Sequence, residues 1–368
     1  MLIKKLAIPA LVVAAALTLA GCAGVGSTAS TDAGGNSAGS AGGTLKVVAT
    51  TTQVADFTRN ILGDTAGVEL TQLIKPNQSA HSFDPSVADL AALGQADVLV
   101  INGVGLEEWL DDAISASGFH GVTIDSDEGI EIGEDAAGND TAHSDEAAEA
   151  THDDATHNDA THDDASADSD HDETHDHSGG NPHIWTAVAN AEKMVGSIAA
   201  GLAQADAAHS DEFEANAAEY TAQLTTLDTW IHANIDAVPA AERLLVSNHD
   251  AFGYFTAAYG ITYVGSVMPS FDDNAEPSAA AIDKLVALIK KTGVKAVFSE
   301  ASINPKAADT IASEAQVAVY SGDDALYGDS LGPAGSDGAT YITSQLHNVR
   351  LILESWGVTP TAVPAELG

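Results

Sequence analysis

The chain has very little positive charge. Its 368 residues include 13 lysines and arginines against 54 aspartates and glutamates, and the formal net charge at pH 7 is -41. A surface of this sign repels nucleic acid and anionic headgroups and gathers cations around it. We therefore expect no nucleic-acid partner. Acidity alone does not indicate metal binding, because it is also a common route to solubility.

Cysteine is nearly absent as well, since Cys22 is the only one, and no disulfide can form within the chain. The segment that it closes, MLIKKLAIPALVVAAALTLAGC, has two lysines, a short apolar run and then small residues. That layout is typical of an export signal and is too short for a membrane span. Leu19-Ala20-Gly21-Cys22 resembles a bacterial lipobox, which implies cleavage after residue 21 and a lipid on Cys22. The protein would then lie outside the cytoplasm, anchored to the cell membrane.

Two stretches lack large apolar side chains. Residues 22–43 are rich in Gly, Ser, Ala and Thr and predict a flexible tether. Residues 134–180 hold 16 carboxylates and no lysine or arginine, and we expect a disordered loop. This loop contains seven histidines: His143, His152, His157, His162, His171, His175 and His177.

A five-residue unit, Thr-His-Asp/Asn-Asp-Ala, occurs three times in a row within this loop, as THDDATHNDATHDDA. Interchangeable units argue against one unique metal geometry. The loop is then either a solvated acidic insertion or a weak, multivalent metal collector. We favour the metal collector, because histidine recurs in register with carboxylates. Both side-chain types are common metal ligands.

The remaining sequence alternates between strand and helix patterns, which predicts parallel sheets covered by helices. The first series, residues 44–205, has predicted strands at 45–49, 68–74, 96–102 and 121–124, and helices at 54–62, 85–93 and 106–114. The second series, residues 239–368, has strands at 243–247, 263–267, 295–299 and 316–320, and helices at 251–258, 278–292, 305–312 and 340–356.

A long helix is predicted between the two series. Apolar residues from Phe213 to Ile235 are spaced by sevens, fours and threes, which is the period of an α-helix. We assign residues 206–238 to this segment, and the part from 211 to 234 would be about 36 Å long at 1.5 Å per residue. The predicted fold is two parallel-sheet α/β lobes joined by one long rigid helix. Ligands of such sheets bind beyond the carboxyl ends of the strands, which here means the cleft between the lobes.

Four candidate metal ligands lie where such a cleft would be lined. His81 occurs in IKPNQSAHSFDPS after a predicted strand, and His183 occurs in NPHIW, where the globular pattern resumes. His249 occurs in LLVSNHDAFGYF at the end of a predicted strand, and Asp329 occurs in the glycine-rich LYGDSLGP. A single histidine is more often structural than a ligand, but three of them with a carboxylate are harder to dismiss.

These segments closely resemble the cluster A-I solute-binding proteins, lipoproteins that deliver zinc or manganese to ABC importers. The resemblance covers nearly the whole chain from Lys46 to Trp356, and HDAFGYF is its most specific piece. It implies metal ligation by His81, His183, His249 and Asp329, with an ABC permease and its ATPase as partners. We expect a monomer.

The chain departs from the family pattern before the second histidine, where Asn181 replaces the usual aspartate. Asp323 and Asp324 lie near Asp329, so they remain alternatives for the fourth ligand. Asp250 and Glu300 are expected behind the ligands, where such partners fix the tautomer of a ligating histidine.

The ligand types favour zinc, because imidazole suits zinc and manganese prefers oxygen. Manganese members of the family tend to have a carboxylate where this chain has His249. The sequence therefore predicts an extracytoplasmic Zn²⁺-binding protein of an ABC importer. A manganese-delivering member and a surface zinc store or adhesin remain alternatives. A secreted zinc hydrolase is disfavoured because the chain has no HExxH, so no enzymatic activity is expected.

Overall fold

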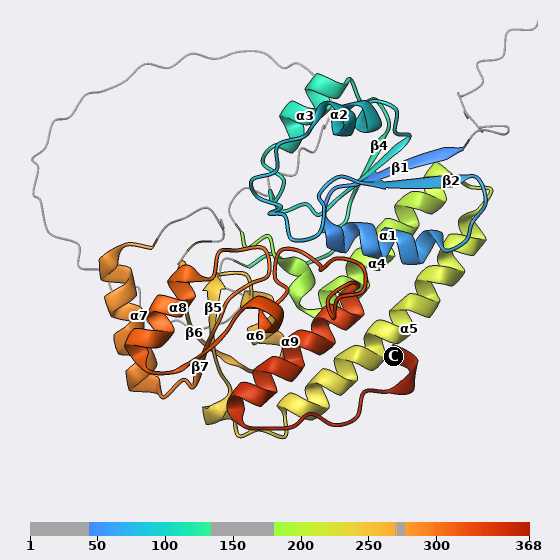
Figure 1. Cartoon of the computed structure of the whole chain (residues 1–368). Helices are drawn as coiled ribbons and strands as arrows, with labels where there is room; N and C mark the ends of the chain where they lie inside the picture. Colours follow the sequence, from blue (N-terminus) through green and yellow to red (C-terminus); the bar gives the residue numbers. More distant parts are fainter. Residues whose placement is uncertain (1–43, 134–179, 269, 271–276) are drawn as a thin grey trace, which may run out of the picture. The chain divides into compact units, whose positions relative to one another are not determined.

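The computed structural model describes residues 44–133, 180–268, 270 and 277–368 (Figure 1). The predicted signal peptide, the lipidation site at Cys22 and the tether lie outside the described residues, as does nearly all of the histidine-rich stretch. Within the described ranges, no helix has the length and apolar character needed to cross a bilayer.

The first lobe is built on one parallel sheet with the strand order β2-β1-β3-β4. Its strands are β1 (Leu45–Ala49), β2 (Val68–Gln72), β3 (Val98–Ile101) and β4 (Val122–Asp125). Its helices are α1 (Thr52–Leu62), α2 (Val87–Leu93), α3 (Leu110–Ser117) and α4 (Val188–Ala205), and a short 3-10 turn, η1 (Ile184–Thr186), precedes α4.

Local capping sets where these helices begin. The Thr51 side chain accepts a hydrogen bond from the backbone of Val54 at the start of α1, and Ser86 forms a capping box at the start of α2. Helix α3 begins later than the sequence predicts. Val104 has a positive φ of 55°, and the Glu107 carboxylate turns back to accept the Asn102 backbone N–H at 2.8 Å. Residues 106–109 are therefore not helical, and α3 begins at Leu110.

The predicted long helix is present as α5 (Ser210–Ile235). It packs against α1 and α4 of the first lobe and also against α9 (Tyr341–Trp356) (Figure 1). The side chains that it buries include Phe213, Tyr220 and Leu224, which the spacing places on one face. One helix thus contributes to the packing of both halves of the chain.

The second lobe is built on two pairs of parallel strands. Strands β5 (Leu244–His249) and β6 (Thr262–Met268) form one parallel pair, and β7 (Ala296–Phe298) and β8 (Ala318–Tyr320) form another. Strand β7 lies near β5, and the His249 backbone N–H donates to the Glu300 carboxylate, two residues beyond the end of β7. The last strand is shorter than predicted, because Gln316 ends the preceding helix with a φ of 62°.

Helices of this lobe are α6 (Gly253–Ala258), α7 (Ala279–Thr292) and α8 (Lys306–Ala315), and 3-10 turns occur as η2 (Ala240–Glu242), η3 (Gly322–Asp324) and η4 (Ala365–Leu367). The largest buried cluster contains residues of both lobes and of α5, including Phe57, Phe213 and Tyr341. Tyr341 closes this junction, because its backbone N–H donates to Asp56 of α1 at 3.0 Å and its hydroxyl donates to the Trp185 carbonyl at 2.7 Å. The predicted class, an α/β protein with parallel sheets in two lobes, is confirmed.

Candidate metal centre

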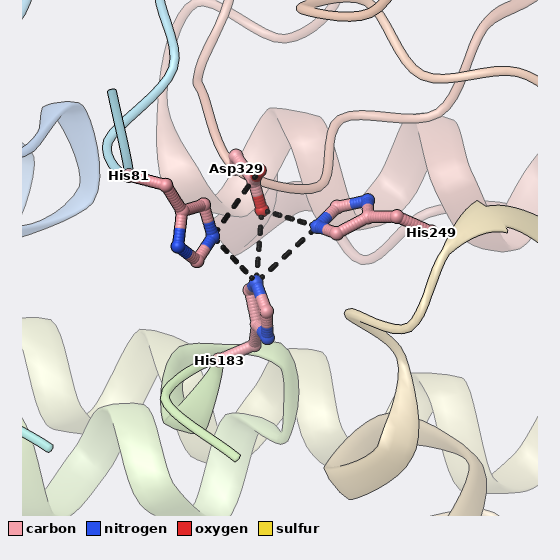
Figure 2. A group of neighbouring side chains, drawn as sticks. All are labelled: His81, His183, His249 and Asp329. Carbon is pink, nitrogen blue, oxygen red and sulfur yellow. Dashed lines mark hydrogen bonds and ion pairs between the residues drawn. The ribbon is translucent and has the colours of Figure 1, made fainter. Parts of the chain in front are cut away.

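Four side chains from four separate segments meet at one point (Figure 2). His81 lies between β2 and α2, and His183 immediately precedes η1. His249 is the last residue of β5, and Asp329 lies in the loop after η3. One nitrogen or oxygen atom of each lies within 4.8 Å of the others. No other such group of histidine, cysteine and acidic side chains occurs among the residues that the structure describes.

The contacts within this group are short. The Nε2 atom of His183 lies 3.1 Å from Nε2 of His81 and 3.3 Å from Nε2 of His249. The Asp329 carboxylate lies 3.2 Å from the His183 nitrogen, 3.1 Å from that of His249 and 3.6 Å from that of His81. The three imidazoles and the carboxylate thus face a common centre.

In two of the imidazoles, the ring nitrogen that faces away from the centre, Nδ1, is hydrogen-bonded to an acceptor. Nδ1 of His183 lies 2.7 Å from the Asn181 side-chain oxygen, and Nδ1 of His249 lies 2.8 Å from Glu300 Oε1. Each acceptor also binds the backbone N–H of the same histidine. Since Nδ1 must donate its hydrogen in these contacts, Nε2 of a neutral ring presents a lone pair to the centre. Facing lone pairs at about 3 Å repel unless a proton or a metal ion lies among them, so the arrangement fits a cation at the centre.

Asp329 supports the same conclusion. Its side chain is completely buried, and neither oxygen has a hydrogen-bond donor of good geometry among the described residues. Burying a carboxylate without such donors is costly, and the usual compensation is a cation or a metal. The neighbouring imidazoles supply part of this compensation when no metal is present.

Charge is divided unequally within the group. Burial lowers the pKa of His183 to about 4, although Asp329 opposes this. Burial also disfavours charge on His249, but Asp329 and Glu300 outweigh it and raise the pKa of His249 well above its ordinary value. Against the effect of burial, His249 and His183 hold the pKa of Asp329 well below its usual range. The second-lobe histidine therefore carries the proton that a metal would displace.

The structure brings together all four residues predicted as ligands. The alternatives Asp323 and Asp324 are exposed in η3 and lie outside the group. Glu300 lies behind His249, as predicted, and Asp250 has its backbone N–H bonded to the Ser270 carbonyl.

Asn181, which stands where the family usually has an aspartate, keeps the hydrogen bond to His183 but has no charge. Sequence reasoning overlooked Asn102, whose side-chain amide donates to the Pro182 carbonyl at 3.1 Å, next to His183. The sequence signal for Asn102 was its polar side chain at the carboxyl end of a buried strand, because ligand sites of α/β proteins gather at such strand ends.

The chain is similar to several known proteins. A sequence model of the family described as "Zinc-uptake complex component A periplasmic" (ZnuA) matches residues 47–355. The chain is 31% identical to the high-affinity zinc uptake system protein ZnuA of Bacillus subtilis, over 76% of this chain and 77% of that protein. It is 27% identical to the manganese-binding lipoprotein MntA of Halalkalibacterium halodurans, over 94% and 97%.

A solved structure shares the fold. The periplasmic zinc-binding protein TroA of Treponema pallidum superimposes with a TM-score of 0.68 at 25% identity, covering 86% of this chain and 99% of that one. The two-lobe architecture is thus common to both proteins, whereas the relatives named here divide between zinc and manganese.

Proposed function

Because the chain belongs to the ZnuA family, whose members are metal-binding proteins of ABC importers and not enzymes, we propose that its cargo is Zn²⁺. The protein captures the ion outside the cytoplasm and delivers it to the permease of the importer, which an ATPase drives. His81, His183, His249 and Asp329 are the ligands. The observation that carries this proposal is the convergence of three Nε2 atoms on one buried carboxylate.

The donor set favours zinc over manganese. Three imidazoles and one carboxylate form a four-coordinate set of the kind that suits Zn²⁺, whereas Mn²⁺ prefers oxygen donors. The position of His249 supports this choice, since an imidazole there leaves a single oxygen ligand residue. The names of relatives such as MntA of Halalkalibacterium halodurans make manganese the alternative cargo.

A competition experiment decides between the two metals. Purified protein is stripped of metal and titrated with Zn²⁺ and with Mn²⁺ against a chelator of known affinity, and the bound metal is counted by elemental analysis. Tight binding of one Zn²⁺ per chain, with Mn²⁺ displaced by equimolar zinc, supports the proposal. Retention of Mn²⁺ in the presence of equimolar zinc contradicts it.

The histidine-rich stretch, residues 134–180, is proposed to be accessory to this site. All four ligands lie outside it. The described residues on either side of the stretch, which end at 133 and resume at 180, belong to the first lobe. Its deletion is expected to leave one tight zinc site and to remove only weaker equivalents, which elemental analysis at rising zinc concentration measures. Loss of the tight site on deletion would place the metal within this stretch.

The location of the protein is part of the same proposal. Cys22 is lipidated and anchors the mature chain, as a monomer, to the outer face of the membrane. Replacement of Cys22 by alanine is expected to release the protein from the membrane fraction without changing its zinc affinity. Metabolic labelling with a fatty-acid analogue tests the attachment directly.

A further inference from the structure

The two first-lobe ligand segments share a backbone feature. The indole N–H of Trp109 donates to the Ala80 carbonyl at 3.1 Å, and Ala80 immediately precedes His81. The side-chain amide of Asn102 donates at 3.1 Å to the Pro182 carbonyl, which immediately precedes the next ligand histidine. In each case a distant side chain holds the carbonyl just before a ligand.

The same feature occurs before the acidic ligand, where it joins the two lobes. The Gly328 carbonyl, one residue before Asp329, accepts the indole N–H of Trp185 at 3.1 Å and the side-chain amide of Gln53 at 3.0 Å. Gln53 belongs to α1 of the first lobe, and its amide oxygen accepts the Thr52 hydroxyl at 2.8 Å. Both donors are buried.

The position of these hydrogen bonds has a geometric consequence. The carbonyl of one residue and the N–H of the next belong to a single planar peptide group. A donor that fixes the carbonyl therefore fixes the plane from which the ligand residue departs. Loop residues need this support because no ladder of strand hydrogen bonds holds them.

His249 differs in a way that agrees with this interpretation. It is the last residue of β5, so its backbone is held by the pairing with β6. Its own N–H is held by Glu300 at 3.1 Å. The ligand that lies in a strand is supported by the sheet, and the three that lie in loops are supported by side-chain donors.

We propose that Trp109, Asn102, Trp185 and Gln53 are positioning residues of the metal site, each acting through the carbonyl that precedes a ligand. Trp109 and Asn102 orient the first-lobe histidines. Trp185 and Gln53 orient the second-lobe carboxylate from the first lobe, so they also retain the metal by holding the lobes together. The inference rests on the proposed metal-binding function.

The four tryptophans of the chain form a matched series for the test. Trp109 and Trp185 donate to carbonyls before ligands, whereas Trp356 donates to the Leu244 carbonyl at 2.9 Å, at the far end of β5. The buried indole N–H of Trp230 has no hydrogen-bond partner among the described residues. Each tryptophan is replaced by phenylalanine, which keeps an aromatic ring and removes the donor.

Zinc dissociation constants, zinc release rates and the melting temperature of the metal-free protein are measured for each variant. Trp109→Phe and Trp185→Phe are expected to raise the dissociation constant about fivefold, the factor that a net hydrogen-bond contribution of about 1 kcal/mol allows. For Trp185→Phe, the higher dissociation constant should result from faster release of zinc. Trp230→Phe and Trp356→Phe are expected to lower the melting temperature and leave the dissociation constant unchanged.

A second pair of variants keeps the test decisive if a tryptophan variant does not fold. Gln53→Met preserves the length of the side chain and removes its donor. Because Gly328 keeps one donor in each single variant, Gln53→Met and Trp185→Phe together should weaken zinc more than the product of their separate effects. Unchanged zinc affinity in Gln53→Met and in the foldable tryptophan variants overturns the proposal. Failure of the unaltered protein to bind zinc would instead overturn the function itself.

Discussion

The two lobes support their buried histidines in opposite ways. Behind His183, in the first lobe, the acceptor is the neutral amide of Asn181. Behind His249, in the second lobe, the acceptor is the carboxylate of Glu300, and the carboxylate of Asp329 lies on the other side of the ring. The support behind the first-lobe histidine is therefore uncharged, whereas the second-lobe half has an excess of negative charge that a metal ion neutralises.

Buried glutamates extend the same contrast. Burial raises the pKa of Glu107 to about 7, although Thr50 and the Asn102 N–H donate to it. Burial raises the pKa of Glu300 as well, but there the His249 imidazole opposes the effect. The first lobe thus buries a carboxyl group that takes up a proton near neutrality, and the second lobe buries one that is paired with an imidazole.

The largest expected effect comes from removing the imidazole between the two carboxylates. His249→Ala should weaken zinc by at least about a thousandfold, because even partners behind the ligands change metal affinity about 10- to 100-fold. It should also destabilise the metal-free protein by about 3–5 kcal/mol, since Glu300 and Asp329 lose their buried counter-ion. Chelator competition and thermal unfolding without metal measure the two effects.

His183→Ala is the matched control for this prediction. It removes the same type of ligand, and the acceptor behind its ring is the neutral amide of Asn181 and not a carboxylate. Zinc affinity should fall by a comparable factor, while the metal-free protein should keep more of its stability than His249→Ala does. Equal melting temperatures of the two metal-free variants would contradict the contrast between the lobes.

The next largest effect concerns the stability of the first lobe as the pH changes. The pKa of Glu107 is raised in the folded state, so its favourable contribution is complete below about pH 4.5 and is lost as the pH rises through about 7. A shift from 4.5 to about 7 corresponds to about 3 kcal/mol. Glu107→Gln stays neutral and should therefore be more stable than the unaltered protein at pH 8, with the difference vanishing at pH 4.5.

Urea unfolding of metal-free protein at both pH values checks this prediction. Glu128→Gln, at an exposed position of the same lobe, is the control for removing a charge at the surface. A destabilised Glu107→Gln at pH 8 would mean that the ionised carboxylate is required for folding.

A smaller effect is expected from neutralising the second-lobe support. Glu300→Gln keeps an oxygen that can accept the His249 Nδ1 hydrogen but removes its charge. Zinc affinity should fall about 10- to 100-fold, the range measured for partners of ligating histidines. Titration against a chelator gives this number, and an unchanged affinity would show that the carboxylate does not act through the ring.

Much of this arrangement could be predicted from the sequence. The spacing of Phe213, Tyr220 and Leu224 reports helical periodicity directly, and α5 agrees with it to within one residue at each end. The ligand histidines became candidates because they follow strands or lie where the globular pattern resumes, and α/β proteins concentrate binding residues there. Their assignment as ligands came from the resemblance to a metal-binding family. The neutral support by Asn181 could also be read from its place two residues before His183.

The remaining features depend on contacts between distant segments, which periodicity does not report. A glycine-rich loop around Asp329 is typical of mobility, yet Gly328 is required for close packing, because a Cβ there would lie 2.0 Å from Glu300 Oε2. Nothing in the local sequence of Trp185 or Gln53 predicts that both donate to that glycine.

The smallest and sharpest change is Asn181→Asp, which gives the first lobe the charged support of the second. The new carboxylate would accept the same hydrogen from His183 Nδ1 and make the ring a stronger donor to the metal, while burying an added negative charge in the metal-free protein. Both effects favour the metal-bound state, so zinc affinity should rise about tenfold, the lower end of the range for such partners. The melting temperature without metal should fall at the same time. Calorimetric titration and thermal unfolding measure both quantities. A lower zinc affinity would show that His183 is held by position alone and that the charge behind a ligand histidine is used only in the second lobe.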